Sequence, residues 1–466
     1  MNNSIFITIS RGGTARNILQ NRFYDLLKKN FNEIYIFSPA YADFRFRNEF
    51  GDKNVFFEKL LEQKDTIFNR LLRSFYTYII YNPTTARMSR YGVAGQEVPR
   101  WYYLKYILYK AFFLPLSKCK FVRKFLQKID LFILQRGMVK FYLDKIDRYN
   151  PTVIFCTSIF EDEDIALLKA GKKRKIPVVA MPKTWDNISK SYFRAKADMV
   201  IVWGEFMEEQ MIKYQDYDRG VIKRIGVPQF DYYVEGSALM TREEFCDLYG
   251  LNKDKKIILI CSEGKISKHD PDVVRMLLHA IENGDLVCDS QILVRPHFAY
   301  KNDEDKFREF ASLTNIIIDR NYKPSAGFKD QWDYSRDQMD RFLNILYHSD
   351  VTINTHSTLT LDAAALNKPT ILIMFDGYTK KPYYRSVARW YTTDYYRKVL
   401  AFKPGRAVGS ESELIHSVNL YLKNPNLDKD NRKKMLDYIC GNIDGKAGDR
   451  LYYLIKNLIP RQKYEG

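Results

Sequence analysis

Two successive series of short apolar segments, alternating with helix-like stretches, constrain the fold of this chain more than any other feature. The segments of the first series lie at 4–9, 33–39, 152–156, 177–181, 199–203 and 221–225. Those of the second series lie at 255–262, 290–298, 315–320, 350–355 and 369–375. Apolar strands that alternate with helices are typical of a parallel sheet covered by helices on both faces. The pattern therefore predicts an α/β protein with two doubly wound, Rossmann-like domains that face one another.

The domain boundaries follow from the same pattern, since 466 residues are too many for one ordinary core. We expect a first domain at 1–235, with a helical, basic and aromatic insertion at about 58–149, and a second domain at 236–427. Residues 428–466 are predicted to form a helical tail. Ligands of open α/β sheets bind at the carboxyl ends of the strands, so we expect the ligand between the two domains.

The basic composition indicates a negatively charged partner. Lys and Arg number 74 against 56 Asp and Glu, which gives a formal net charge of +18 and a pI near 9.3. Such an excess favours nucleic acid, an anionic membrane surface or phosphorylated substrates, and does not choose among them.

Cysteine usage and hydropathy bear on the compartment. The six cysteines show no paired spacing, which indicates reduced thiols rather than a disulfide framework or a zinc site. The first residues enter a strand pattern directly, and no apolar run approaches the ~20 residues that a membrane span requires. We therefore expect a cytoplasmic protein that does not span a membrane.

Residues 100–128 are unusually basic and aromatic, with eight Lys or Arg and no acidic residue. A helix of this composition suits the anionic interface of a bilayer. Aromatic residues among basic ones also suit single-stranded nucleic acid, and a packed helix with a solvated basic face has the same composition. We favour membrane contact because the pattern is helical, and expect peripheral attachment to the inner face of the plasma membrane without a nucleic-acid partner.

The turn at 355–358 separates a predicted strand from a predicted helix, and consists of Thr355, His356, Ser357 and Thr358. Hydroxyl side chains and backbone N–H groups at a helix start can bind phosphate, and the same residue types commonly cap helices. Both interpretations stay open from spacing alone. Asp362, one turn into the helix, could reach a ligand hydroxyl or support the helix start.

Arg295 and His297 lie at the end of another predicted strand, which places a cation and an imidazole at the edge of the expected cleft. His297 could hydrogen-bond a phosphate or protonate a leaving group. A single histidine after a strand is also commonly a packed residue without a chemical role, so this pattern leaves the role of His297 open.

Four acidic residues, at 161–164, open a predicted helix that closes with lysines. They could form a metal site of the Asp-x-Asp kind. However, acids at the start of a helix and bases at its end are the order that the helix dipole favours. We therefore expect no metal, while Glu161 or Asp162, close to a strand end, could act as a base in the cleft.

The stretch VAMPKTWDNISK, at 179–190, places polar and aromatic residues directly after a strand. In a functional interpretation Lys183 faces a phosphate, Trp185 packs against a ring and Asp186 deprotonates an acceptor hydroxyl. In the alternative, Trp185 is a core residue and Asp186 forms a turn with Asn187. The sequence alone does not decide between the two interpretations.

The loop RGGTARN, at 11–17, matches neither the P-loop pattern nor the G-x-G-x-x-G fingerprint, so we expect no dinucleotide site. Gly12 and Gly13 could bring the backbone close to an acceptor or a phosphate. Arg11 or Arg16 would then supply positive charge.

The stretches KTWDNISK, ADMVIVWGEFMEEQ, IGVPQFDYY, VRPHF and NTHSTLTLDAAALNKPTI occur in that order over about 152–375. This succession resembles bacterial surface-polysaccharide glycosyltransferases of the GT-B fold, related to the CDP-glycerol glycerophosphotransferases of teichoic acid synthesis. The resemblance implies an N-terminal acceptor domain, a C-terminal nucleotide-donor domain and chemistry without a metal or other cofactor.

The resemblance also implies roles for particular residues. Ser357 and Thr358 would bind donor phosphates, with Arg295, His297, Thr355, His356 and Asp362 around them. His297 stands in the family's histidine-proline position, although here the order is Pro296-His297. Teichoic members carry a histidine-glycine pair where this chain has Met181 and Pro182, which favours sugar transfer. Asp186 is then the first candidate for the base, with Asp162 and Glu161 as substitutes.

Together these observations predict a glycosyltransferase that moves a sugar from a nucleotide-activated donor, by direct displacement, to a lipid-linked or growing cell-surface glycan such as capsule or O-antigen. One alternative is transfer of an alditol phosphate from a CDP-linked donor. A nucleotide-sugar 2-epimerase shares the architecture but needs no membrane-facing segment. The alternative from another class is a basic nucleic-acid-binding protein, which leaves the two Rossmann-like halves unexplained.

Overall fold

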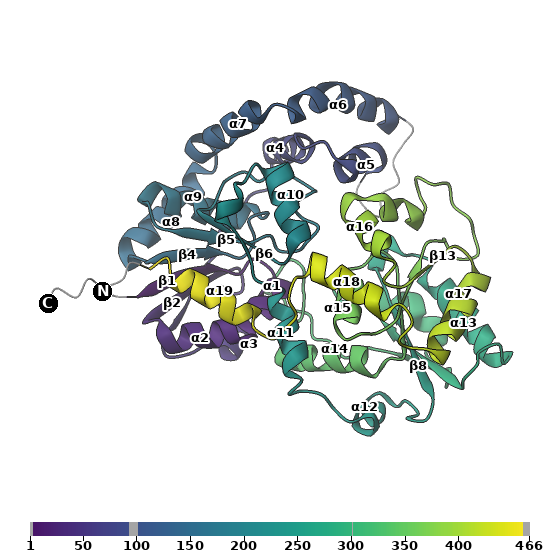
Figure 1. Cartoon of the computed structure of the whole chain (residues 1–466). Helices are drawn as coiled ribbons and strands as arrows, with labels where there is room; N and C mark the ends of the chain where they lie inside the picture. The colour runs from purple at the N-terminus through teal and green to yellow at the C-terminus, as the bar shows by residue number, and fades with distance from the viewer. Residues whose placement is uncertain (1–2, 93–100, 301, 460–466) are drawn as a thin grey trace.

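The computed structural model describes residues 3–92, 101–300 and 302–459, and shows two α/β domains side by side (Figure 1). Over these ranges the N-terminal sheet has seven parallel strands in the order β3-β2-β1-β4-β5-β6-β7, and the C-terminal sheet has six in the order β10-β9-β8-β11-β12-β13. The N-terminal strands are β1 Ser4–Thr8, β2 Glu33–Ser38, β3 Val55–Lys59, β4 Val153–Cys156, β5 Val178–Ala180, β6 Met199–Val202 and β7 Ile222–Arg224. The C-terminal strands are β8 Lys256–Cys261, β9 Ser290–Arg295, β10 Ile316–Ile318, β11 Val351–Asn354, β12 Thr370–Ile373 and β13 Arg406–Val408. The prediction of two Rossmann-like domains is confirmed.

Helices cover both faces of each sheet, which is why the central strands are apolar along their whole length. Every residue of β1, β4, β5 and β11 is buried. The N-terminal domain carries α1 Gly12–Leu19, α2 Arg22–Asn30, α3 Phe44–Phe50, α9 Asp162–Arg174, α10 Glu205–Gln215 and α11 Pro228–Glu235. The C-terminal domain carries α12 Arg242–Tyr249, α13 Asp270–Glu282, α14 Arg336–His348, α15 Leu359–Ala365, α16 Asp394–Phe402 and α17 Glu411–Lys423.

The sequence pattern missed two strands, β3 and β13, and both lie at the edge of their sheet. β3 is only partly buried, and β13 has three residues of which one is buried. A strand that is half exposed carries little of the continuous apolar signal by which buried strands are recognised.

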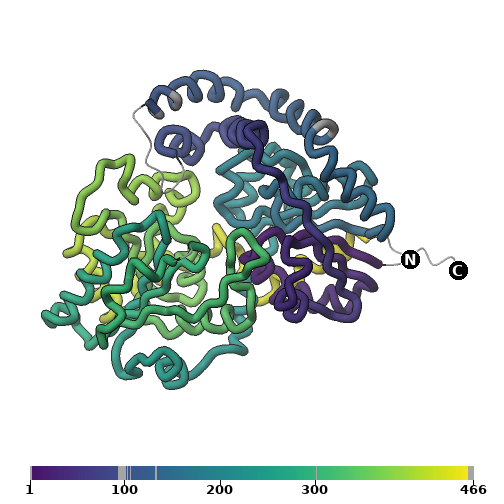
Figure 2. Tube along the Cα trace, turned by 180° about the vertical axis from the view of Figure 1, so that it is seen from behind, coloured from purple at the N-terminus to yellow at the C-terminus, as the bar shows by residue number. Residues whose placement is uncertain are grey.

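The helical segment predicted at about 58–149 has two parts. α8 Arg136–Tyr149 packs on the N-terminal sheet, since its Val139, Tyr142 and Ile146 belong to the buried core. α4 Ile67–Tyr78, α5 Pro83–Tyr91, α6 Tyr102–Ser117 and α7 Lys120–Ile133 lie outside that layer. Figures 1 and 2 show α6 and α7 as an arch along one edge of the molecule. In the described part of the chain, no helix combines the length and the apolar character needed to cross a bilayer.

The predicted tail forms α18 Lys429–Ile439 and α19 Ala447–Lys456. α19 returns to the N-terminal domain, where Leu451, Tyr452 and Ile455 join its buried core. The carboxylate of Asp231 on α11 accepts hydrogen bonds from the backbone N–H groups of Ala447 and Gly448, at 3.0 and 2.7 Å, and so holds the start of α19.

A long loop between β10 and α14 also crosses from one domain to the other. We call residues 319–335 the strap. Its Phe328 and Tyr334 are buried in the core of the N-terminal domain, where both rings contact Phe46. The two domains are therefore fixed to each other by apolar packing on the side of the glycine loop.

Candidate active site

The loops that follow the two sheets meet between the domains. Trp185, in the loop after β5, is 1% exposed and donates a hydrogen bond from Nε1 to Thr358 Oγ1 of the C-terminal domain, over 3.2 Å. Its ring also packs edge-on against Tyr395, with centroids 5.3 Å apart. The burial of Trp185 agrees with its interpretation as a core residue, here at the junction of the two domains, while contact of its ring with a ligand stays a prediction.

Asp186 lies beside Trp185 and is paired with a lysine of its own loop. Thr184 Oγ1 and Lys190 Nζ each donate a hydrogen bond to its carboxylate. Burial alone would raise the pKa of Asp186, but the ammonium of Lys190 and the hydrogen bonds hold it below its usual value. The carboxylate is therefore ionised at neutral pH and can accept a proton. No role for Lys190 was predicted from the local pattern.

His356 faces this pair from the C-terminal domain. Its ring stacks on Trp390, with centroids 5.2 Å apart and planes 10° apart. Its Nδ1 is buried and has no hydrogen-bond partner among the described residues. Burial lowers the pKa of His356 to about 3, and the nearby Lys190 adds to the effect. The imidazole is neutral at pH 7 and has one ring nitrogen available to a ligand.

His297 has the same character. Its ring packs against Tyr300 and, edge-on, against Trp332 of the strap, with centroids 4.7 and 6.1 Å away. Asp303 accepts a hydrogen bond from the backbone N–H of His297 at 2.8 Å, while Nδ1 is buried without a partner in the described ranges. Burial lowers the pKa of His297 to about 4. An unpartnered buried nitrogen costs free energy unless a ligand satisfies it.

Glu263 is a residue of this site that the sequence pattern missed. It follows β8 at the carboxyl edge of the sheet, and its carboxyl group hydrogen-bonds Ser357. Burial raises the pKa of Glu263 to about 7, against the opposing effect of that hydrogen bond. The next residue, Gly264, has φ of +60°, and a Cβ there would collide with the ring of Tyr300. In the sequence, the position of Glu263 just after a predicted strand could have marked it as a candidate site residue.

The hydroxyl turn at 355–358 is held by local hydrogen bonds at the start of α15. Ser357 Oγ accepts a hydrogen bond at 3.2 Å from the backbone N–H of Leu359, the first residue of α15, whose N-cap Thr358 makes no side-chain capping bond. Tyr396 OH donates to the backbone carbonyl groups of Thr355 and Ser357, at 3.5 and 3.4 Å, and so holds the turn. The role of the turn in phosphate binding stays a prediction.

Arg295 and Asp362 lie deeper and have protein partners. Arg295 lies between the rings of Phe298 and Phe342, at 4.3 and 4.5 Å, and 3.6 Å from Asp319. The carboxylate of Asp362 accepts hydrogen bonds from Tyr233 OH at 2.6 Å and Gln229 Nε2 at 2.8 Å, both on α11. These contacts give Asp362 a structural role between the domains, and donor binding by either residue stays a prediction.

The acidic residues proposed as substitute bases are held in ion pairs. Arg11 Nη2 lies 2.7 Å from Glu161 Oε2, and Lys183 Nζ lies 3.0 Å from Glu161 Oε1. Burial would raise the pKa of Glu161, but Lys183 and Arg11 lower it to about 2. Asp162 pairs with Arg194 at 2.5 Å. Glu161 is therefore a weak proton acceptor, and the role of Asp186 as the base stays a prediction.

The glycine loop contacts the strap. The backbone N–H groups of Gly12 and Gly13 donate hydrogen bonds to the two oxygens of Asp330, at 3.1 and 3.4 Å. A Cβ at Gly12 would lie 2.5 Å from the carbonyl oxygen of Trp332, so the close approach requires glycine. The ring of Trp332 also contacts Arg16, 5.1 Å from its centroid. In this arrangement the loop binds a carboxylate of the same chain.

The structure separates the acidic residues that the sequence groups at 161–164. Over the described ranges, no group of three or more His, Cys, Asp or Glu side chains is arranged to hold a metal ion. The acids of α9 are divided among separate basic partners, as the pairs of Glu161 and Asp162 illustrate. Their order fits a helix start, and the expectation that no metal is needed stays a prediction.

Comparison with known proteins places this site in a family. The family model described as CDP-Glycerol:Poly(glycerophosphate) glycerophosphotransferase matches residues 175–457, more than half of the chain. No curated protein matches the chain.

Solved structures share the fold at low identity. UDP-GlcNAc 2-epimerase from Neisseria meningitidis bound to UDP-GlcNAc has a TM-score of 0.57 and 10% identity, covering 98% of this chain and 100% of that one. UDP-GlcNAc 2-epimerase from Methanocaldococcus jannaschii has a TM-score of 0.54 and 13% identity, covering 98% and 100%. A glycosyltransferase from Rickettsia africae has a TM-score of 0.53 and 14% identity, covering 99% and 100%. These similarities establish the two-domain GT-B fold.

Proposed function

The chain belongs to the CDP-glycerol:poly(glycerophosphate) glycerophosphotransferase family, and we propose that it transfers a sugar from a nucleoside-diphosphate donor to a hydroxyl group of a lipid-linked or growing cell-surface glycan. Family and fold together make it a transferase of the GT-B type. The observation that carries the proposal is the junction at Trp185 and Thr358, which brings Asp186 near His356 of the other domain.

In the proposed reaction Asp186 acts as the base. The acceptor oxygen attacks the anomeric carbon, the bond from that carbon to the diphosphate oxygen breaks, and the acceptor proton passes to Asp186. The nucleoside diphosphate leaves with the electron pair. Neutral imidazoles of His297 and His356 and the hydroxyl groups at 357–358 would donate hydrogen bonds to the developing charge. The proposal requires no metal or other cofactor for chemistry.

A second candidate is favoured by the description of the family itself. In transfer of an alditol phosphate from a CDP-linked donor, the acceptor oxygen attacks the β-phosphorus and CMP leaves. The two reactions release different products, a nucleoside diphosphate in the first and a nucleoside monophosphate in the second. Product analysis therefore separates them without knowledge of the acceptor.

The proposal also includes attachment to the inner face of the plasma membrane through α6 and α7. Leu104, Leu108 and Phe112 follow one another at helical spacing on α6 and are 61%, 63% and 57% exposed. On α7, Phe121 and Phe125 are stacked and largely exposed. An exposed apolar stripe of this kind is expected to contact a partner or a membrane.

Basic residues flank this apolar stripe. Lys110, Lys118, Lys120, Lys124 and Lys128 are exposed. Arg123 differs, since it is buried and pairs with Asp216 at 2.7 Å, which anchors α7 to the N-terminal domain. Lysines beside exposed aromatic side chains favour an anionic lipid surface.

Nucleotide binding and product release test the proposal. Purified protein is first melted with CMP, CDP, UDP, GDP or dTDP, with and without Mg²⁺, because a ligand of the native state raises the melting temperature. The corresponding nucleotide-linked donor is then incubated with the protein and neutral methyl glycosides, and the released nucleotide is identified by anion-exchange chromatography. Release of a nucleoside diphosphate is expected. Release of CMP from a CDP-alditol supports the second candidate instead, and no nucleotide response contradicts both.

Asp186→Asn tests the proposed base. We expect the same nucleotide-dependent rise in melting temperature as in the wild type, with turnover reduced by about 10²–10⁴-fold. Asp218→Asn is the control, since Asp218 is an exposed aspartate of the same domain. Unchanged turnover in Asp186→Asn rejects the assignment.

Vesicle sedimentation tests the membrane contact. The protein is expected to sediment with vesicles of phosphatidylglycerol and phosphatidylcholine, but not with phosphatidylcholine alone. Phe121→Ser/Phe125→Ser should reduce binding, while Phe44→Ser, at a residue that is 82% exposed on α3, should not. Equal binding of all three proteins would rule out the proposed surface.

A further inference from the structure

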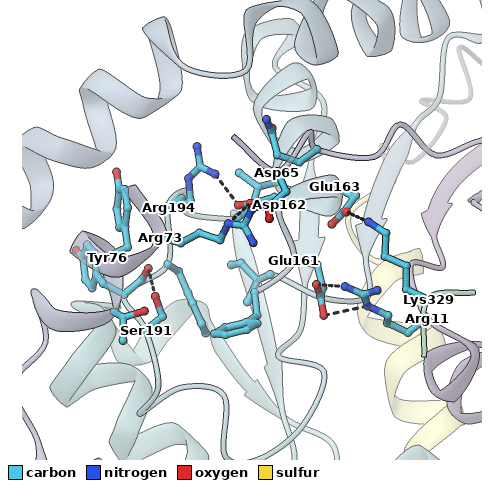
Figure 3. A pocket seen from close by; sticks show the side chains of 17 residues that line it. Arg11, Asp65, Arg73, Tyr76, Glu161, Asp162, Glu163, Ser191, Arg194 and Lys329 are labelled. Atoms are coloured by element: carbon cyan, nitrogen blue, oxygen red, sulfur yellow. Dashed lines mark hydrogen bonds and ion pairs between the residues drawn. The ribbon is translucent and has the colours of Figure 1, made fainter. Parts of the chain in front are cut away.

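A cavity of about 340 Å³ lies in the N-terminal domain beside the proposed catalytic loop (Figure 3). It is lined by the end of the loop before α4, by α4 itself, by the start of α9 and by residues 191–194. Neither the proposed nucleotide site nor the membrane surface includes it. A cavity of this size with charged lining residues accommodates one or two sugar rings.

The charges that line the cavity are balanced and paired. Four basic side chains, Arg11, Arg73, Arg194 and Lys329, face four acidic ones, Asp65, Glu161, Asp162 and Glu163. Arg73 lies 2.9 Å from Asp65 and 3.5 Å from Asp162. Arg11 contacts Glu161 at 2.7 Å, Arg194 contacts Asp162 at 2.5 Å, and Lys329 contacts Glu163 at 3.5 Å. Figure 3 shows Arg11 and Lys329 facing their carboxylates. The lining therefore carries no net charge.

This lining fits an uncharged ligand that is rich in hydroxyl groups. Fixed carboxylates accept hydrogen bonds from hydroxyl groups, and fixed guanidinium groups donate to them. The half-buried ring of Phe160 supplies an apolar surface for the C–H face of a sugar. A phosphate group would meet four carboxylates and would have to separate a cation from its partner, which leaves a buried carboxylate uncompensated.

The position of the cavity relates it to the proposed base. Glu161 lines the cavity and also contacts Lys183, which lies three residues before Asp186. Ser191 lines it and directly follows Lys190, the partner of Asp186. α4, which belongs to the same helical segment as α6 and α7, also lines the cavity, and its Tyr76 accepts a hydrogen bond from the backbone N–H of Tyr192, next to Ser191. A saccharide in the cavity would therefore lie next to the loop that carries Asp186 and its partner Lys190.

We propose that this cavity is the acceptor subsite and that it takes an uncharged saccharide unit rather than an alditol phosphate. The inference rests on the proposed transferase function, which it deepens by naming the chemical class of the acceptor. It also distinguishes this chain from a polymerase of glycerol phosphate, whose growing end carries a negative charge on every unit.

Saturation-transfer NMR tests the inference with defined probes. Methyl N-acetyl-β-D-glucosaminide and methyl β-D-galactoside are the neutral probes, and glycerol 3-phosphate and ribitol 5-phosphate are the charged ones, each added to the full chain with and without the nucleotide found by thermal shift. We expect transfer to at least one neutral glycoside and none to the phosphates. Transfer only to a phosphate, or to no probe, overturns the inference.

Two arginine variants on α4 assign any binding to the cavity. Arg73→Ala removes a lining side chain and should weaken glycoside binding at least fivefold. Arg70→Ala removes the same charge from the same helix, outside the cavity lining, and should bind as the wild type does. Equal binding by both variants overturns the inference. Both are expected to retain the nucleotide-dependent rise in melting temperature, so failure of the acceptor assignment is distinguishable from failure of the proposed function.

A second variant tests the same placement of the saccharide if Arg73→Ala does not fold. Ser191→Leu fills the cavity without removing a charge, and should also abolish glycoside binding. Retained binding in a folded Ser191→Leu protein contradicts the placement of the saccharide in this cavity.

Discussion

The indole Nε1 of Trp185 donates a hydrogen bond to Thr358 Oγ1 over 3.2 Å and joins the loop after β5 to the turn before α15. These loops belong to different domains, and each follows a strand of its own parallel sheet. The contact fixes the catalytic candidate Asp186 relative to the residues proposed to bind the donor.

Trp185→Phe is expected to destabilise the protein only slightly. The phenyl ring keeps most of the packing against Tyr395, and the loss of one hydrogen bond costs about 1 kcal/mol. Trp185→Ala also removes a buried ring, at a cost of about 4 kcal/mol. Thermal melting compares the two with Trp101→Phe, at a residue that is 63% exposed. Equal losses in Trp185→Phe and Trp185→Ala would show that the hydrogen bond, and not the ring, holds the junction.

Asp164→Asn should change how stability depends on pH. Asp164 is fully buried, with Oδ1 accepting hydrogen bonds from Thr8 Oγ1 and from Ser158 N, and burial raises its pKa to about 7. The folded protein holds this proton more tightly than the unfolded chain does. The protonated Asp164 therefore contributes fully to the stability of the fold below about pH 4, and this contribution is lost as the pH rises to about 7. Asparagine imitates the neutral acid at every pH. The variant should therefore gain stability relative to the wild type by up to about 1.4 kcal/mol per pH unit over that window.

Denaturant titrations at pH 5, 6, 7 and 8 measure this difference. Asp218→Asn serves as the control, because Asp218 is exposed. A constant difference between Asp164→Asn and the wild type would mean that Asp164 is ionised in the folded protein throughout.

Nucleotide binding is expected to take up protons. Burial and Lys190 hold the pKa of His356 at about 3 in the free protein. A diphosphate placed beside the ring would raise that pKa, so affinity should increase as the pH falls from 7 to 5. Isothermal titration at pH 6 in two buffers of different ionisation enthalpy measures the protons taken up. The variant His356→Gln should no longer take up protons on nucleotide binding. The control His416→Gln, at an exposed residue, should take them up as the wild type does. Identical heats in both buffers for the wild type would refute the coupling.

Asp130→Ala should be strongly destabilising, by about 3–5 kcal/mol. The buried carboxylate of Asp130, on α7, accepts hydrogen bonds from Lys169 of α9 and from Arg194 at 2.8 and 3.1 Å. Its removal takes a carboxylate from two buried cations, of which Arg194 keeps Asp162 and Lys169 keeps only the amide oxygen of Gln135. Adding Lys169→Met removes one of these cations and should restore part of the loss in melting temperature. A double variant less stable than Asp130→Ala alone would contradict this electrostatic explanation.

Much of the fold could be predicted from local pattern, because a buried parallel strand must be apolar along its length. The central strands β1, β4, β8 and β11 were predicted for this reason. The edge strands β3 and β13 were not, because exposure weakens the signal. The return of α19 to the first domain was also beyond the pattern, since Asp231 and Ala447 are far apart in the chain.

The sequence by itself determined which residues follow the strands. Because ligands bind at the carboxyl edge of a parallel sheet, local pattern was enough to make Asp186, His297 and Ser357 candidate site residues. Only the tertiary structure decided how those residues are paired. It joined Lys190 to Asp186, tied Glu161 to Arg11 and gave Glu263 its place beside Ser357. Protonation and charge balance depend on burial and on neighbours brought together from distant parts of the chain, and a one-dimensional pattern contains neither of these.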